Sequence, residues 1–242
     1  EFNRHFLAYH PAYSIITNIE REHLEIYKDI DDIRTTFEKF ASQTKKKIVA
    51  CGDNKEIRKI HFNDNVIFYG FNDNNDVVIR NEKLGENGSS FDLYINNELF
   101  DSFEVPLYGE HMVLNTAAAI TMCRELGIPI NSIKNSLKTF HNAERRFQIE
   151  EVGTTTIIDD YAHHPTEIKV TLEGVRQKYP DRKIVVVFKP NTYSRTKDFT
   201  EEFASALNIA DKVFLTEIDC NREKQEDYPG VSSILILSLI HI

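Results

Sequence analysis

From residue 154 onward, apolar β-branched runs alternate with charged segments that have helical periodicity. In chain order, the three runs and the two segments between them cover residues 154–160, 165–178, 183–188, about 197–207 and 212–218. Parallel strands need a crossover connection, usually a helix, and this alternation is its sequence pattern. The second part of the chain is therefore predicted to be a doubly wound α/β domain that starts near residue 150 and has only three strands.

The first part of the chain mixes strand and helix signals in another order. The predicted elements are a strand at 13–19, a helix at 29–44, a strand within 46–54, an antiparallel meander from Val66 to Leu107, and helices at 109–129 and 130–140. The helix at 109–129 has a glycine start, an alanine-rich body and a Gly-x-Pro stop. We expect two domains, at 1–148 and 149–230, and a tail at 231–242.

Composition and the chain ends exclude several classes of protein. The net charge of −9 argues against nucleic acid as the main partner, and three cysteines without CxxC spacing indicate no disulfide framework and fit a cytoplasmic protein. The start of the chain has no signal-peptide pattern. The final ILILSLIHI is too short for a bilayer-spanning helix, which needs roughly 20 apolar residues, so no membrane insertion is expected. This tail is either a buried strand or helix or a sequence foreign to the native chain.

Polar side chains gather after the first two predicted strands of the second domain. The first cluster is Asp159, Asp160, Tyr161, His163 and His164, and the second is Lys189, Asn191, Tyr193, Ser194, Arg195 and Lys197. Ligands of open parallel sheets bind outside the carboxyl ends of the strands, so the two clusters together suit a polar, anionic ligand. A solvated loop is the alternative for the first cluster. Adjacent histidines usually point apart, so they are weak evidence for a metal site.

Five motifs occur in the order typical of the Mur ligases, the ATP-dependent amide-forming enzymes of peptidoglycan synthesis. They are TNIEREH (17–23), GEHMVLNTAAA (109–119), ERRF (144–147), IIDDYAHHPTEI (157–168) and FKPNTYSRT (188–196). The chain resembles this family across residues 1 to 217. The resemblance implies an α/β fold in which part of the family's central domain, with the antiparallel meander, precedes a truncated Rossmann-like C-terminal domain.

Among Mur ligases, the chain is most similar to members that join L-alanine to UDP-N-acetylmuramate. That similarity implies phosphorylation of a carboxylate by ATP and attack of an amino group on the acyl phosphate, with Mg²⁺ and cations neutralising the phosphoryl group. Two alternatives stay open. One is a muropeptide ligase that uses a ready-made peptide, although it lacks the Tyr-Ser-Arg-Thr pattern found at 193–196. The other is a non-catalytic module that binds nucleotide or a partner protein.

In the first domain, the resemblance implies three site residues. His23 resembles a ligand of the second Mg²⁺, and Asn115 resembles the family's adenine contact, because an amide both donates to and accepts from a purine edge. His111 lies beside Asn115 in the same motif. From the residues alone, the alternative for His23 is a surface histidine without a functional role. For His111 and Asn115 the alternative is helix capping.

At the junction of the two domains and in the second domain, the resemblance implies five more. Arg146 resembles the arginine that reaches the ATP phosphates, and Asp160 resembles a carboxylate on the ribose or phosphate side. Tyr161, His163 and Arg195 correspond to the region of the amino acid and the muramoyl group, and His163 joins Arg146 and Asp160 as a predicted catalytic residue. A surface ion-pair network with Glu144 and Glu150 is the alternative for the Arg-Arg pair.

The chain also departs from the family pattern. Met112 replaces the usual second asparagine of the Gly-x-His-Asn motif, and Lys189 to Asn191 replace Gln-Pro-His. No G-x-x-x-x-G-K-[ST] loop occurs in the 242 residues, and Glu1 resembles the acidic position that follows the family's Mg²⁺-binding glutamate. The expectation is an internal fragment of a longer ligase that is inactive by itself.

Overall fold

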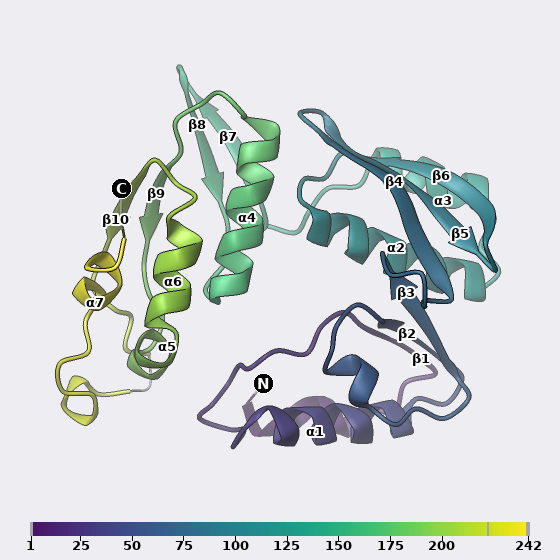
Figure 1. Ribbon diagram of the computed structural model, residues 1–242, viewed down its shortest axis with the longest axis horizontal. Coiled ribbons are helices and arrows are strands. Elements are labelled where there is room, and N and C mark those ends of the chain that lie inside the picture. Colours follow the sequence, from purple (N-terminus) through teal and green to yellow (C-terminus); the bar gives the residue numbers. More distant parts are fainter. Residues whose placement is uncertain (1, 222, 241–242) are drawn as a thin grey trace. The chain divides into compact units, whose positions relative to one another are not determined.

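The computed structural model describes residues 2–221 and 223–240, so Glu1 and the last two residues of the apolar tail lie outside it. The chain divides after Phe140 into two compact units (Figure 1). In the described ranges, no helix combines the length and the apolar character that crossing a bilayer requires.

The first unit is built on a mixed six-stranded sheet. Its strands are β1 (Tyr13–Ile16), β2 (Lys47–Cys51), β3 (Val66–Gly70), β4 (Val77–Gly85), β5 (Gly88–Ile95) and β6 (Glu98–Val105), and they lie in sequence order. β1 to β4 pair in parallel, whereas β4, β5 and β6 form antiparallel pairs.

The predicted meander is therefore wrong at its first strand. β3 pairs in parallel with both β2 and β4, and the antiparallel part begins only at β4. The physical reason is visible in the sequence VIFY, which has no polar position and so has the continuous apolar character of a strand within a parallel sheet. Tyr69 at its end is fully buried.

Three α-helices and two 3₁₀ helices complete the first unit. They are α1 (Ile30–Gln43), α2 (Glu110–Glu125), α3 (Ile130–Lys138), η1 (Phe2–Ala8) and η2 (Ile57–Lys59). α2 packs on the sheet through Val113, Ala117 and Ile120, all of which are buried. The predicted helix at 109–129 is confirmed with a shorter range, because Gly127 adopts a φ of 75° after its last turn.

The second unit contains two separate strand pairs. β7 (Gln148–Val152) and β8 (Thr155–Asp159) form an antiparallel hairpin, and β9 (Val185–Phe188) pairs in parallel with β10 (Lys212–Leu215). The parallel pairing is confirmed for β9 and β10. It is wrong for β8, whose hydrogen-bonded neighbour is β7, a strand that the sequence analysis missed. Gly153 permits this tight connection with a φ of 62°.

Five helices accompany these strands in the residues of the second unit that the structure describes. They are α4 (Pro165–Lys178), α5 (Tyr193–Asp198), α6 (Thr200–Leu207), η3 (Gln225–Asp227) and α7 (Ser233–Leu237). α4 and α6 pack against each other, with Leu172 and Phe203 among the buried side chains. β8, β9 and β10 all run toward the end of the unit where α4 begins and α5 lies (Figure 1). Residues 234–237 of the apolar tail lie in α7, and Ile236 is fully buried.

Candidate functional site

The start of α4 is fixed by a capping box between His164 and Glu167. His164 Nδ1 accepts a hydrogen bond from the Thr166 amide at 3.3 Å, and Glu167 Oε2 accepts from the His164 amide at 3.2 Å. Pro165 occupies the first helical position, where a missing N–H costs nothing. His164 is buried against the ring of Phe199, with the ring centroids 5.1 Å apart. Its role in the structure is therefore to start a helix and fill a core position.

Glu167 connects this helix start to two predicted site residues. Its carboxylate accepts from the His163 amide at 2.9 Å and lies 3.4 Å from His163 Nδ1. It also lies 3.8 Å from Arg146 Nη1. Sequence reasoning missed Glu167, although its place three residues after His164 has the spacing of a capping box.

Tyr161 is surrounded by charged and aromatic groups. The guanidinium carbon of Arg145 lies 5.0 Å from the ring centroid, and that of Arg146 lies 5.8 Å from it. The His163 ring meets the same ring edge-on at 5.1 Å. Arginine over an aromatic face is a favourable cation–π arrangement. The structure therefore brings Arg146, Tyr161 and His163 together around one exposed ring.

Asp160 directs both carboxylate oxygens at backbone amides. Oδ2 accepts from the Phe147 amide and Oδ1 accepts from the Ala162 amide, each at 2.8 Å. These bonds join the loop after β8 to the segment that contains Arg146. The neighbouring Asp159 lies 3.6 Å from Arg145 Nε. Arg145 thus lies close to Asp159 and Arg146 close to Glu167, whereas the alternative interpretation of the sequence placed the ion pairs at Glu144 and Glu150.

The backbone of this segment is unusual. Arg145 and Phe147 have φ values of 56° and 52°, a left-handed conformation that is uncommon outside glycine. Such residues cost on the order of 1–3 kcal/mol each and persist only where the surroundings hold them. The Tyr161 amide donates to the Arg145 carbonyl at 2.8 Å, and the Arg146 amide donates to the Ala143 carbonyl at 3.2 Å.

The second predicted cluster begins in the loop after β9 and continues into α5. Thr192 begins α5, and its hydroxyl accepts from the Arg195 amide at 3.3 Å. Arg195 Nη1 donates to the carbonyl and the side-chain oxygen of Asn191, at 3.0 and 3.3 Å. Lys189 Nζ lies 2.8 Å from Asp219 Oδ2, and this hydrogen bond lowers the pKa of the Asp219 carboxyl. The positions that depart from the family pattern, 189 and 191, are therefore both engaged in local contacts.

The two clusters share one end of the second unit but make different contacts. The ring contact between His164 and Phe199 joins the start of α4 to the segment between α5 and α6. Arg195 bonds to Asn191, whereas Asp160 and His163 bond to backbone amides and to Glu167. A shared ligand site for Arg195 and Asp160 stays a prediction.

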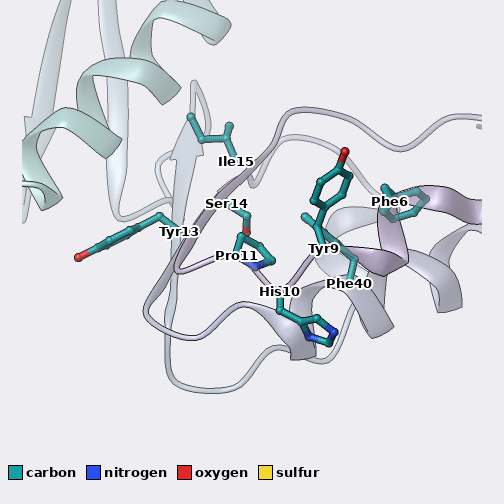
Figure 2. A pocket seen from close by; sticks show the side chains of 8 residues that line it. All are labelled: Phe6, Tyr9, His10, Pro11, Tyr13, Ser14, Ile15 and Phe40. Atoms are coloured by element: carbon teal, nitrogen blue, oxygen red, sulfur yellow. The ribbon is translucent and has the colours of Figure 1, made fainter.

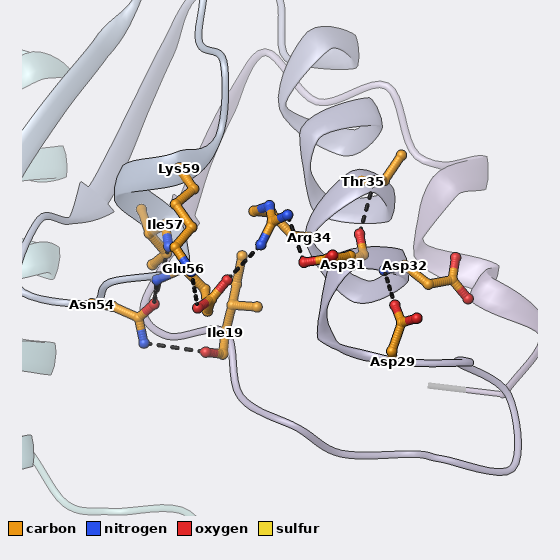
Figure 3. Close-up of polar contacts among 10 residues, drawn as sticks. All are labelled: Ile19, Asp29, Asp31, Asp32, Arg34, Thr35, Asn54, Glu56, Ile57 and Lys59. Carbon is orange, nitrogen blue, oxygen red and sulfur yellow. Dashed lines mark hydrogen bonds and ion pairs between the residues drawn. The ribbon is translucent and has the colours of Figure 1, made fainter.

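In the first unit, His23 lies in the connection between β1 and α1. Its Nδ1 lies 3.2 Å from Glu25 Oε1, and its backbone has a φ of 53°. The connection is tied to the turn after β2 because Asn54 Nδ2 donates to the Ile19 carbonyl at 3.3 Å (Figure 3).

The same turn is joined to α1 by a charged network (Figure 3). Arg34 bridges Asp31 and Glu56 with two contacts of 2.7 Å, and Lys59 Nζ lies 2.7 Å from the second oxygen of Glu56. The hydrogen bond from Lys59, followed by that from Arg34, lowers the pKa of the Glu56 carboxyl. The first part of the His23 loop is thus attached to a turn that α1 holds in place.

His23 and the residues around it do not by themselves fit a Mg²⁺ centre. Mg²⁺ prefers oxygen ligands in octahedral geometry, and an imidazole supplies none. Across the described part of the chain, no group of three or more His, Cys, Asp or Glu side chains is arranged to hold a metal ion. His23 would supply a single ligand.

His111 and Asn115 lie four positions apart on α2, which places them on the same helix face. Asn115 is exposed, and His111 is partly buried. Gly109 is the N-cap residue, and both His111 and Asn115 lie within the helix that follows it. Met112 packs against the core of the unit instead of joining this face.

A separate groove of about 390 Å³ lies beside β1 (Figure 2). Its lining is mainly aromatic and apolar, and consists of Phe6, Tyr9, His10, Pro11, Tyr13, Ser14, Ile15 and Phe40. No predicted site residue is among these, so the groove does not explain the sequence motifs.

Comparison with protein families assigns almost the whole chain to two domains. Residues 3–123 match the Mur ligase middle domain, and residues 145–234 match the glutamate ligase domain of Mur ligases.

Solved structures of these enzymes are similar to the chain. UDP-N-acetylmuramate–alanine ligase from Thermotoga maritima has 28% sequence identity and a TM-score of 0.75, covering 89% of this chain and 48% of its own. MurF ligase from the same organism, solved with ADP, has 22% identity and a TM-score of 0.69, with 88% and 50% covered. A murein peptide ligase from Psychrobacter arcticus has 22% identity and a TM-score of 0.58, with 87% and 44% covered. The chain spans about half the length of these proteins.

Proposed function

We propose, because this chain belongs to the Mur ligase family, that it contributes the middle and C-terminal parts of an ATP-dependent ligase that joins L-alanine to UDP-N-acetylmuramate. The observation that carries this proposal is the likeness to the alanine ligase of Thermotoga maritima, at 28% identity and a TM-score of 0.75. The murein peptide ligase is less similar by both measures. The Tyr-Ser-Arg-Thr pattern at 193–196 supports the same choice.

Arg146 is the proposed contact to the phosphates of ATP. Its guanidinium is permanently charged and offers paired donors, which match the geometry of phosphate oxygens. The side chain is about half exposed, so it reaches a ligand without losing its contact to Tyr161. When bound, ATP supplies the phosphoryl group that activates the substrate carboxylate.

Asn115 and His111 are the proposed contacts to the adenine. The amide of Asn115 projects from α2 into solvent and has both a donor and an acceptor for the purine edge. His111 lies one turn before it on the same face. This pair would select the nucleotide by its base.

Tyr161, His163 and Arg195 are the proposed substrate contacts in the second unit. His163 is oriented by Glu167 and by the Tyr161 carbonyl, which lies 3.0 Å from its Nδ1. The exposed Tyr161 ring offers an apolar surface beside two guanidinium groups. Such a combination suits a ligand that carries both a carboxylate and a hydrocarbon part, as L-alanine does.

The test is an assay of the full-length gene product with ATP, Mg²⁺ and UDP-N-acetylmuramate. Phosphate release should depend on free L-alanine and should be at background with a ready-made muropeptide. Release that depends on the peptide instead would assign the protein as a muropeptide ligase. ATP binding without release under any acceptor would assign a non-catalytic binding module.

A further inference from the structure

The backbone between Arg145 and Phe147 is held by more contacts than an exposed turn needs. The Phe147 amide donates to Asp160 Oδ2, and the Arg145 carbonyl accepts from the Tyr161 amide, both at 2.8 Å. These two bonds join the segment to consecutive residues of the loop after β8. A carboxylate that accepts an amide hydrogen forms a charge-assisted bond, which is stronger than one between neutral groups.

The second oxygen of Asp160 fixes the direction of the carboxylate. Oδ1 accepts from the Ala162 amide at 2.8 Å, which closes a short turn within the Asp160 loop. Both oxygens are thus committed to backbone groups, one on each of two segments. The carboxylate therefore acts as a bridge, and its position is set by the loop that precedes α4.

Arg146 lies between the two left-handed residues. With φ values of 56° at Arg145 and 52° at Phe147, the direction in which the Arg146 side chain leaves the backbone depends on this conformation. This backbone conformation places the Arg146 guanidinium over the Tyr161 ring and beside the Glu167 carboxylate. Left-handed conformations in residues other than glycine persist only where neighbouring groups hold them.

We propose that Asp160 is a positioning residue, whose carboxylate keeps Arg145 and Phe147 in their left-handed conformation and so determines where the guanidinium of Arg146, the residue between them, lies. The inference rests on the proposed function only for its consequence in catalysis, where Arg146 is the phosphate contact. The conformational role is independent of any ligand, because every contact that carries it lies within the second unit.

The conformational role is tested first by amide hydrogen exchange of the 242-residue chain, followed by nuclear magnetic resonance. The Phe147 amide should be protected in the unaltered chain, although it precedes β7. In Asp160→Asn its exchange should become roughly tenfold faster or more, because the charged acceptor is lost. Asp159→Asn is the matched control: Asp159 lies close to the Arg145 side chain, and its substitution should leave the exchange of the Phe147 amide unchanged. An unprotected Phe147 amide in the unaltered chain overturns the proposal without any variant.

A second comparison tests whether Asp160 restrains the backbone. In the Asp160→Asn background, Arg145→Gly and Arg145→Ala both remove the side chain, but only glycine adopts a positive φ without strain. The glycine variant should regain part of the Phe147 protection, and the alanine variant should not. Equal protection in the two would show that the conformation at residue 145 is not what Asp160 holds.

The catalytic consequence is tested in the full-length gene product by a double-mutant cycle. If Asp160 acts through Arg146, Asp160→Asn should lower kcat in the unaltered enzyme but have little further effect once Arg146→Ala is present. Full additivity would show that Asp160 contacts the substrate or nucleotide by itself and would overturn the positioning role. If the gene product is inactive but Asp160→Asn still loses its Phe147 protection as expected, the proposed function alone would be rejected.

Discussion

Arg146 Nη1 lies 3.8 Å from Glu167 Oε1, and the same carboxylate closes the capping box of α4. Glu167 therefore has two roles that different substitutions separate.

Glu167→Ala should destabilise the second unit by about 1 kcal/mol, because it removes the helix cap. Glu167→Gln should keep most of the stability, since glutamine also serves in a capping box, while it removes the charge beside Arg146. Thermal unfolding of both variants measures the difference, with Glu173→Ala, a change later in the same helix, as the control. Equal stability of the alanine variant and the unaltered chain would contradict the capping role.

Arg146→Ala in the full-length gene product should lower turnover by roughly 100-fold, since the loss of a charge contact to a developing phosphoryl charge costs about 3 kcal/mol. Its melting temperature should change little, because exposed ion pairs contribute little to stability. Arg80→Ala is the matched control: Arg80 also lies over a tyrosine, Tyr94, and pairs with an exposed carboxylate, that of Asp73. Similar turnover in the two variants would show that Arg146 is a surface ion-pair residue and does not contact the phosphates.

Acid should weaken the second unit partly through Asp211. The Ile184 amide, and then Arg176, donate hydrogen bonds to its carboxylate and hold its pKa below the usual range. A lowered folded-state pKa contributes stability that is complete above the unfolded value of about 3.9 and is lost as the pH falls through the folded value. Asp211→Asn should therefore reduce the difference between urea midpoints at pH 7 and pH 3. The exposed Asp198→Asn is the control, and an unchanged difference in Asp211→Asn would refute the assignment.

The 242-residue chain by itself should release no phosphate above a no-enzyme blank when it is incubated with ATP, Mg²⁺, UDP-N-acetylmuramate and L-alanine. Phosphoryl transfer depends on positioning and on charge neutralisation, and the sequence has no phosphate-binding glycine-lysine loop to supply them. Alanine-dependent release well above the blank would show that other residues of this chain perform that role.

The sequence predicted the elements whose local pattern agrees with their environment. α2 was predictable because its glycine boundaries and alanine-rich body coincide with the buried face that it presents to the sheet. β7 was not, because all five residues of QIEEV are exposed and show no alternation of burial. Its pairing with β8 is determined by the turn at Gly153 and by hydrogen bonds, neither of which hydrophobic periodicity reveals.

The candidate site shows the same division. Motifs and the order of strands predicted that Tyr161 and His163 would follow a strand, and the structure has them after β8. The partners of these residues depend on the path of the backbone. Nothing in the spacing of Phe147 and Asp160, thirteen positions apart, indicates that an amide and a carboxylate meet there. Glu167 is intermediate, because its capping role follows from local spacing whereas its contact to Arg146 does not.

The hydrogen bonds between residues 145–147 and the loop after β8 make Arg146 part of the second unit. The chain divides after Phe140, and the Arg146 amide is bonded to Ala143 while the Arg145 carbonyl is bonded to Tyr161. In any rearrangement of the two units, the guanidinium therefore moves with the second unit, because its contacts to Tyr161 and Glu167 lie there. Lengthening or shortening the stretch at residues 141 and 142, which precedes these bonds, should leave the local surroundings of Arg146 unchanged.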